Sequence, residues 1–357
     1  MELWHDRILV LDFGSQYTQL IARRIREAQV YSQILPCTVP LATVLAYRPK
    51  GIVLSGGPSS VYDKKAPSVS KQLFEQGIPI LGICYGMQLV THLQGGEVEK
   101  APHREFGRAE LTLDDRSDLF KGIGTRGSTV VWMSHGDRIE RMPPGFRSIA
   151  HTENSPIAAM KRHDAKQRIY CLQFHPEVAH TVEGATILKN FVYDICGCKP
   201  TWTMRSYVET AVEQIRQQVG TERVICALSG GVDSSVAAAL THRAVGDQLT
   251  CVFVDNGVLR TGERDQVEKT FASQMHLNMR ILDRTSQFLT GLKNVTDPER
   301  KRKIIGRLFI KNFEVESKKL KGIKYLVQGT LYPDVIESVS FKGPSATIKT
   351  HHNVGGL

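Results

Sequence analysis

The N-terminal part of the chain alternates short apolar runs with segments whose apolar residues fall on one side of a helix. Apolar runs rich in β-branched residues predict buried strands, and one-sided segments at residues 18–27 and 68–76 predict helices. The predicted strands are residues 5–13, 51–54 and 78–83. A strand, polar turn and helix in repeated order are typical of a parallel α/β sheet.

The pattern changes after Gly95. Short strands are predicted at residues 108–113, 129–133, 148–151 and 169–173, as in a more mixed sheet, and residues 184–195 predict a closing helix. The segment CGCKPTWT (196–203) contains glycine and proline and interrupts the periodicity. We therefore expect two domains, residues 1–198 and 199–357.

The second domain restarts the α/β rhythm. An amphipathic helix is predicted between Tyr207 and Val219, and residues 265–275 predict another helix. Strands are predicted at residues 224–228, 249–254, 279–282 and 325–328. The predicted fold class is therefore α/β, with two open, mainly parallel-sheet domains.

Composition and charge restrict the classes of partner that this chain is expected to bind. The net charge of +10 favours anionic partners, which nucleotides satisfy as well as nucleic acid. The densest basic run, residues 298–307, contains no aromatic residue, so we expect no nucleic-acid partner. No signal peptide and no bilayer-spanning apolar stretch is visible, and the seven cysteines lie mostly in apolar runs. These features predict a cytoplasmic protein with reduced thiols and no membrane contact.

The stretch RVICALSGGVDSS (223–235) predicts an anion site. An apolar strand leads into two glycines and then into the start of a helix, where backbone N–H groups and the helix dipole attract phosphate. The candidate phosphate-binding residues are Ser229, Gly230, Gly231, Val232, Asp233, Ser234 and Ser235. A Walker A loop would have a lysine where Asp233 stands, and an acid beside phosphates indicates an intervening metal ion. The alternative is a glycine-containing turn that binds nothing.

A second candidate site lies in ILGICYGMQ (80–88). A strand enters Gly82, presents Cys84 and leaves through Gly86 into a helix, which is the G-x-C-x-G form of the nucleophile elbow. The helix N-terminus stabilises a thiolate. The N–H of Tyr85 and the turn containing Gly57 are candidate oxyanion donors.

The segment QFHPE (173–177) supplies a base and an orienting acid. His175 and Glu177 point the same way if this segment is extended, a geometry that Pro176 favours. Cys84, His175 and Glu177 are therefore a candidate catalytic triad. Each residue alone is a weak signal, because buried cysteines and surface histidines are common.

These motifs, with Ser55–Pro58 and SHGD (134–137), resemble the class I, triad-type glutamine amidotransferases between about Arg7 and Ile195. The resemblance implies that Cys84 forms a glutamyl thioester, His175 is the base and Glu177 orients it. It also implies that Gly57 and Tyr85 bind the oxyanion and that Gln88 helps to hold glutamine. The ammonia released requires an acceptor site protected from bulk water.

The loop SGGVDSS resembles the pyrophosphate-binding loop of N-type ATP pyrophosphatases, whose fold is Rossmann-like. These enzymes cleave ATP between the α- and β-phosphates, so the resemblance implies ATP as co-substrate and Mg²⁺ as cofactor. Residues 252–260 (VFVDNGVLR) are expected to line the adenosine pocket at the same sheet edge.

The order of the two domains, with RKIIGR (302–307), QGTLYPDVIES (328–338) and IKTHHNVGG (348–356), resembles the family of glutamine-hydrolysing GMP synthetases over essentially the whole chain. The resemblance implies glutamine, ATP and xanthosine 5′-monophosphate (XMP) as substrates. It implies a metal or phosphate role for Asp334 and Glu337, although Asp334 could equally cap a helix. Lys349, His351 and His352 match a lid loop over ATP. The basic residues at 301–303 and Arg307 could equally form a solvated helix face.

Members of that family continue into a C-terminal domain that carries the dimer contact and much of the acceptor site. We expect this sequence to lack that domain and the full-length enzyme to be a homodimer. Two alternatives stay open: a tRNA-modifying ATP pyrophosphatase, or an amidating ligase with another acceptor. The first would need a sulfur-carrying cysteine, often paired, and an RNA-binding appendage, and neither is apparent.

Overall fold

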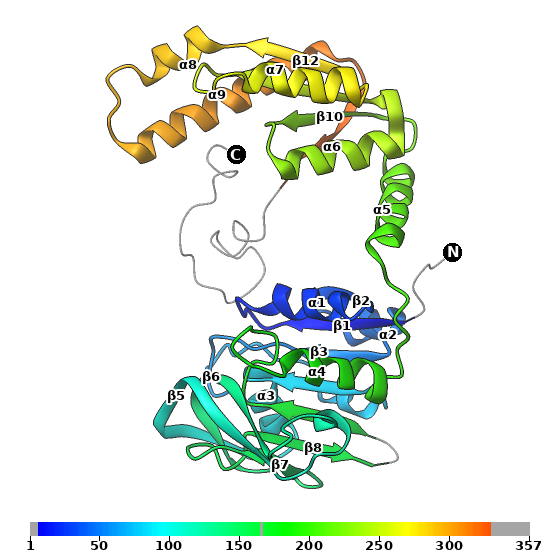
Figure 1. The fold of residues 1–357 in the computed structure, drawn as a ribbon, viewed down its shortest axis with the longest axis vertical. Coiled ribbons are helices and arrows are strands. Elements are labelled where there is room, and N and C mark those ends of the chain that lie inside the picture. Colours follow the sequence, from blue (N-terminus) through cyan, green and yellow to red (C-terminus); the bar gives the residue numbers. More distant parts are fainter. Residues whose placement is uncertain (1–5, 165–166, 330–357) are drawn as a thin grey trace. The chain divides into compact units, whose positions relative to one another are not determined.

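A computed structural model describes residues 6–164 and 167–329, with the backbone alone for residues 101–104. The chain divides into two compact units between Thr203 and Met204 (Figure 1). This division lies at the end of the segment 196–203, five residues after the boundary that the sequence predicts at Cys198. Each unit is described by itself below.

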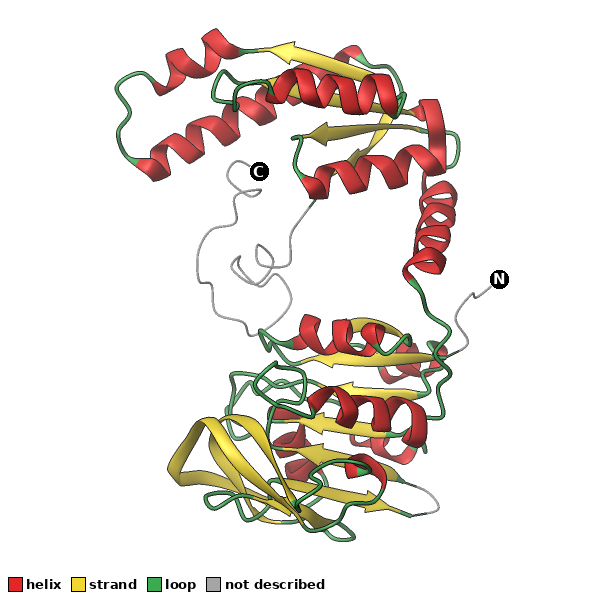
Figure 2. Ribbon diagram, in the orientation of Figure 1, coloured by secondary structure: helices red, strands yellow, loops and turns green. Residues whose placement is uncertain are grey.

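The first unit contains a sheet flanked by helices on both sides (Figure 2). Its elements are β1 (Arg7–Asp12), α1 (Thr18–Glu27), β2 (Tyr31–Pro36), α2 (Leu41–Ala46), β3 (Gly51–Leu54), the 3₁₀ helix η1 (Lys71–Glu75), β4 (Ile80–Ile83), α3 (Tyr85–Leu93), β5 (Glu97–Leu113), the 3₁₀ helix η2 (Asp118–Phe120), β6 (Ser128–Arg141), β7 (Arg147–His151), β8 (Ala159–His163), β9 (Arg168–Leu172), α4 (Gly184–Lys189) and the π-helical turn η3 (Asn190–Ile195).

The described strands of this unit form one mixed sheet in the order β2-β1-β3-β4-β9-β8-β7-β5-β6. Strands β2, β1, β3, β4 and β9 are parallel. The remaining strands pair in antiparallel fashion. This confirms a parallel α/β region followed by a mixed extension. The parallel region matters most for the site, because its strands all end at one edge.

Side chains of β1 alternate between two hydrophobic cores. Ile8 and Val10 pack in the core that contains residues of α1 and α4, whereas Leu9 and Leu11 pack in the core that contains residues of α2, η1 and α3. The strand is therefore apolar at successive positions because both faces of the sheet are covered.

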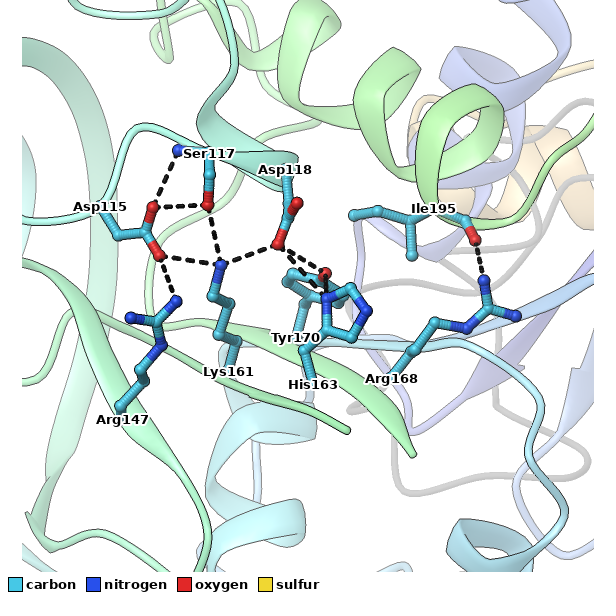
Figure 3. A network of polar contacts seen from close by, with 9 residues as sticks. All are labelled: Asp115, Ser117, Asp118, Arg147, Lys161, His163, Arg168, Tyr170 and Ile195. Carbon is cyan, nitrogen blue, oxygen red and sulfur yellow. Dashed lines mark hydrogen bonds and ion pairs between the residues drawn. The ribbon is translucent and has the colours of Figure 1, made fainter. Parts of the chain in front are cut away.

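A polar cluster around Lys161 fixes η2 and β7 to strand β8 (Figure 3). The Lys161 side chain is only 3% exposed, and its ammonium lies 2.8 Å from carboxylate oxygens of both Asp115 and Asp118. It also donates to the hydroxyl of Ser117, and Arg147 contacts Asp115 from the other side. Burial alone would raise the pKa of Asp115, but hydrogen bonds from Lys161 and Ser117 hold that pKa well below its ordinary value. The cluster therefore stabilises this part of the unit as long as both carboxylates are ionised.

The second unit is also an α/β layer structure (Figure 1). Its elements are α5 (Met204–Val219), β10 (Arg223–Leu228), α6 (Val232–Val245), the 3₁₀ helix η4 (Gly246–Gln248), β11 (Leu249–Asp255), α7 (Glu263–Val267), the π-helical turn η5 (Glu268–Gln274), β12 (Met279–Asp283), α8 (Thr285–Leu292), α9 (Pro298–Lys319) and β13 (Ile323–Val327).

The described strands of the second unit form a parallel sheet in the order β12-β11-β10-β13. One core joins this sheet to residues of α5, α6, α7 and η5, and a second core joins it to residues of α8 and α9. The exposed residues 301–303 of α9 lie on the surface, while Ile305 and Phe309 of the same helix pack on the sheet. The solvated-face interpretation of the basic run therefore agrees with the structure.

Several elements differ from the prediction. The helix predicted at residues 68–76 is the shorter 3₁₀ helix η1, which Ser70 caps by accepting from the Gln72 N–H. The elements β2, α2, β8, α8 and α9 were not predicted. In α2 the apolar run LATVLA is only six residues long, too short to show a helical period. Among the described residues, no helix is long and apolar enough to cross a membrane.

Candidate active sites

Cys84 lies in a sharp turn between β4 and α3. Its backbone has φ 51° and ψ −105°, a conformation that L-residues adopt only at a cost in strain. A Cβ on Gly82 would lie 2.8 Å from the carbonyl oxygen of Gly86, and a Cβ on Gly86 would clash with the carbonyl of Leu54. The glycines on both sides of Cys84 are therefore required by the close approach of β3, β4 and α3.

The glycine turn after β3 lies beside this cysteine, because β3 and β4 are adjacent parallel strands. A Cβ on Gly56 would lie 3.7 Å from Cβ of Cys84 and 3.2 Å from Cε1 of His175. A Cβ on Gly57 would lie 2.7 Å from the carbonyl oxygen of Phe13 and 3.4 Å from the ring of Tyr85. Tyr85 is the first residue of α3, so its N–H has no acceptor within the helix.

His175 and Glu177 follow the end of β9, the strand beside β4. His175 Nδ1 lies 2.7 Å from Glu177 Oε1, and Glu177 is fully buried. Burial would lower the pKa of His175, but the charge of Glu177 and the contact with Cys84 outweigh it and hold the pKa of His175 well above its usual value. An imidazolium here would stabilise negative charge on the sulfur of Cys84.

The backbone around His175 is anchored on both sides. The His175 N–H donates to the carbonyl of Trp132 at 3.1 Å, and the hydroxyl of Thr181 donates to the His175 carbonyl at 2.6 Å. Arg24 Nε donates to the Glu177 carbonyl at 3.0 Å. These bonds set the direction of the imidazole and the carboxylate.

Two further groups, to which the sequence analysis assigned no role, contact Cys84. The carbonyl oxygen of Ser134 lies 3.6 Å from Cys84 Sγ, and Nε2 of Gln173 lies 3.9 Å from it. The Oε1 atom of Gln173 is buried and has no hydrogen-bond partner. Gln88 is buried, and its Nε2 donates to the carbonyl of Asp137 at 3.1 Å. The motifs QFHPE and SHGD contained the signal for Gln173 and Ser134, but their spacing does not show which atoms face the sulfur.

In the second unit, the glycine loop closes on itself at the start of α6. Gly230 has φ +80°, and a Cβ there would lie 2.9 Å from Val267 Cγ2, so glycine is required. The Ser229 N–H donates to the hydroxyl of Ser234, which itself donates to the carbonyl of Gly231. The hydroxyl of Ser235 donates to the same carbonyl at 2.6 Å. These bonds fix the conformation of the loop around the first turn of the helix.

The loop opens at an edge shared with two other strands. Val232 and Asp233 are exposed in the first turn of α6. The register pairs Leu228 with Phe253, so residues after β11 emerge at the same edge, as expected. A Cβ on Gly329, which follows β13, would lie 3.2 Å from the backbone N of Ser234.

Five candidate residues lie outside the described part of the chain: Asp334, Glu337, Lys349, His351 and His352. Within the described part, no three histidine, cysteine, aspartate or glutamate side chains gather as they would around a metal ion.

The folds and these two sets of residues define a class of protein: a class I glutamine amidotransferase followed by an ATP pyrophosphatase. Comparison with known families agrees. Residues 9–195 match the family of class-I glutamine amidotransferases, and residues 204–304 match the family described as NAD synthase.

Curated relatives show which enzyme family joins these two domains in one chain. The chain is 55% identical to a glutamine-hydrolysing GMP synthase of Wolinella succinogenes, over 99% of this chain and 68% of the relative. It is 56% identical to that of Solidesulfovibrio magneticus over 99% of this chain and 68% of the relative, and 54% identical to that of Fusobacterium nucleatum over 98% and 68%. The chain belongs to the glutamine-hydrolysing GMP synthases, which are carbon–nitrogen ligases that use ATP and take nitrogen from glutamine.

Proposed function

We propose that this chain makes GMP in two coupled reactions, with Cys84 and the loop Ser229–Ser235 as the two centres. Glutamine hydrolysis at Cys84 supplies ammonia. XMP is adenylated by ATP with release of pyrophosphate, and ammonia then displaces AMP to give GMP. The glutaminase reaction is supported by the geometry around Cys84. This cysteine has φ 51° between β4 and α3, and it lies next to His175, whose Nδ1 is 2.7 Å from the buried Glu177 carboxylate.

In the glutaminase half, Cys84 Sγ attacks the side-chain amide carbon of glutamine. His175 takes the thiol proton and delivers it to the amide nitrogen, which leaves as ammonia and leaves a glutamyl thioester. Water then attacks the thioester through the same base, and glutamate and the thiol are released. Glu177 orients the imidazole and stabilises its charged form.

The oxyanion formed in each attack needs two donors. The N–H of Tyr85 follows Cys84 at the start of α3, and the N–H of Gly57 follows β3, the strand beside β4. Each preorganised donor of this kind typically lowers the activation barrier by about 3–4 kcal/mol. Gln88, held by the carbonyl of Asp137, contacts the bound glutamine in this proposal.

In the synthetase half, the loop Ser229–Ser235 receives the phosphates of ATP at the N-terminus of α6. Asp233 is an exposed carboxylate in that first turn, and Mg²⁺ commonly takes one or two carboxylates together with phosphate oxygens. The residues present therefore fit Mg²⁺ bound with ATP, with Asp334 and Glu337 as further acids. When bound, Mg²⁺ neutralises the charge that develops on the leaving pyrophosphate. Lys349, His351 and His352 would close over ATP as a lid.

We also propose that the enzyme is cytoplasmic and acts as a homodimer. All seven cysteines are free thiols in the structure, as is usual in a reducing compartment. Analytical ultracentrifugation of the enzyme tests the dimer, since a single sedimenting species of monomer mass would contradict it.

The substitution Cys84→Ala tests the proposed function. Glutamine-dependent GMP synthesis should be lost, whereas synthesis from added ammonium should stay within about twofold of the parent enzyme. Cys198→Ala is the matched control, because Cys198 is similarly buried at 5% exposure and lies next to Gly197, which contacts Lys50 before the start of β3, whereas the site follows the strand ends. Loss of both activities, or retention of glutamine-dependent synthesis, would contradict a separate amidase centre at Cys84.

A further inference from the structure

Strand β6 contacts three separate parts of the proposed glutamine site through its backbone. The contacts are made by the carbonyl groups of Trp132, Ser134 and Asp137. Their partners are the backbone N–H of His175 at 3.1 Å, Sγ of Cys84 at 3.6 Å and Nε2 of Gln88 at 3.1 Å. A small displacement of β6 would therefore move the base, the nucleophile and the glutamine-binding amide relative to one another.

One side chain within this stretch, His135, is itself fully enclosed. Its side chain is 1% exposed, and Nδ1 lies 3.0 Å from the carbonyl oxygen of Asp137. A carbonyl oxygen can only accept, so Nδ1 of His135 carries the proton and donates it. The carbonyl of Asp137 thus accepts from both His135 and Gln88.

The other ring nitrogen of His135 faces a buried carboxylate. Its Nε2 lies 3.3 Å from Oε2 of Glu105, which stands directly opposite on β5. Two lone pairs facing each other in a buried site would repel, so a proton lies between Nε2 and Oε2. The imidazole therefore bridges the Asp137 carbonyl and the Glu105 carboxylate.

Glu105 is anchored from a third element. In the connection between β7 and β8, the hydroxyl of Thr152 donates to Oε1 at 3.0 Å and the hydroxyl of Ser155 donates to Oε2 at 2.8 Å. Burial would raise the pKa of Glu105, but the hydrogen bonds from His135, Ser155 and Thr152 outweigh it and keep the pKa below its ordinary value. Glu105 is thus an ionised group held in one position by three donors.

We propose that Glu105 is a positioning residue for glutamine binding, acting through His135. Glu105 fixes the imidazole, the imidazole fixes the Asp137 carbonyl, and that carbonyl sets the orientation of the Gln88 amide. Neither Glu105 nor His135 touches glutamine. This inference rests on the proposed function of Cys84 and Gln88 as the glutamine site.

The substitution Glu105→Gln removes the charge and keeps the shape. The KM for glutamine should rise at least tenfold, kcat should stay within about threefold, and ammonium-dependent synthesis should be unchanged within about twofold. Glu110→Gln is the matched control, because Glu110 lies on the same strand and accepts from Ser128 of β6 but is exposed. Thr152→Ala removes one anchor of Glu105 and should raise KM in the same direction by a smaller factor.

A merely structural role would reduce the amount of folded enzyme without changing KM. An unchanged KM in Glu105→Gln, whatever happens to kcat, would therefore overturn the proposal. If Glu105→Gln does not fold, the KM of Thr152→Ala for glutamine is the test: a raised KM supports the proposal and an unchanged KM overturns it.

A binding measurement separates this inference from the proposed function. In a Cys84→Ala background, which cannot turn over glutamine, calorimetry should give a Kd for glutamine that Glu105→Gln raises at least tenfold. Equal affinity with and without Glu105→Gln overturns the positioning role alone. Absence of glutamine binding in Cys84→Ala itself would instead contradict the glutamine site.

Discussion

Replacing Glu177 with glutamine tests whether its charge is needed for glutamine hydrolysis. Glu177 is fully buried, and its Oε1 lies 2.7 Å from Nδ1 of His175. Glutamine has the same size, so the substitution removes the charge with little change in packing. It can also present its amide N–H₂ group to Nδ1, which would leave the ring proton on the nitrogen that should accept from Cys84.

The expected effect follows from the electrostatics of the pair. When His175 takes the proton of Cys84, it becomes an imidazolium next to the Glu177 carboxylate. Two unit charges about 4 Å apart attract by about 4 kcal/mol at an effective dielectric constant of about 20. A neutral hydrogen bond in the variant would recover about 1 kcal/mol. The remaining loss of about 3 kcal/mol corresponds to a fall of roughly a hundredfold in rate.

The assay compares kcat/KM for glutamine hydrolysis with the rate of GMP synthesis from ammonium. Glu177→Gln should lower the first roughly a hundredfold and leave the second within about twofold. Glu183→Gln is a suitable control, because Glu183 lies in the same segment and accepts from the Gly124 N–H at 3.1 Å, away from His175. A variant that hydrolyses glutamine within threefold of the parent would show that the charge of Glu177 has no catalytic importance.

Three further results are expected. Lys161→Met should lower the free energy of unfolding in urea by about 2–4 kcal/mol at pH 7. Because the pKa of Asp115 is held below its ordinary value, that difference should shrink as the pH falls below about 4, and a pH-independent difference would refute the ionic explanation. Gly86→Ala should destabilise the enzyme by about 1–3 kcal/mol in the same assay, because the new Cβ meets the Leu54 carbonyl; unchanged stability would contradict this packing. Asp233→Asn should reduce ATP–pyrophosphate exchange at least tenfold while glutamine hydrolysis is unaffected, and normal exchange would exclude a metal role for Asp233.

Much of each candidate site could be predicted from the sequence, because each site is built from short segments whose own residues are close together. The turn at Cys84 and the loop at Gly230 are short segments in which close backbone approach (Gly82 and Gly86) or a positive φ (Gly230) requires glycine at fixed positions. The pair His175 and Glu177 lies two residues apart after a strand, so an extended backbone suffices to bring the side chains together.

The contacts between residues far apart in sequence could not be predicted in this way. Glu105, His135 and Ser155 come from three elements, and each residue alone resembles an ordinary polar residue of a mixed sheet. The same holds for Lys161, whose two carboxylate partners lie far from it in sequence. Their positions depend on the register of β5 and β6 and on the path of the β7–β8 connection, which hydrophobic periodicity does not specify.

The sequence by itself determined the α/β class, the two consecutive α/β regions and the local chemistry of the two turns, because these depend on periodicity, glycine placement and spacing within a few residues. Only the tertiary structure decided what surrounds those turns: the order of the strands, the groups that face the sulfur of Cys84 and the buried ion pairs that hold the sheet. The physical reason is that such contacts join residues far apart in sequence, and their energies depend on burial and on distances that exist only after the sheets have formed.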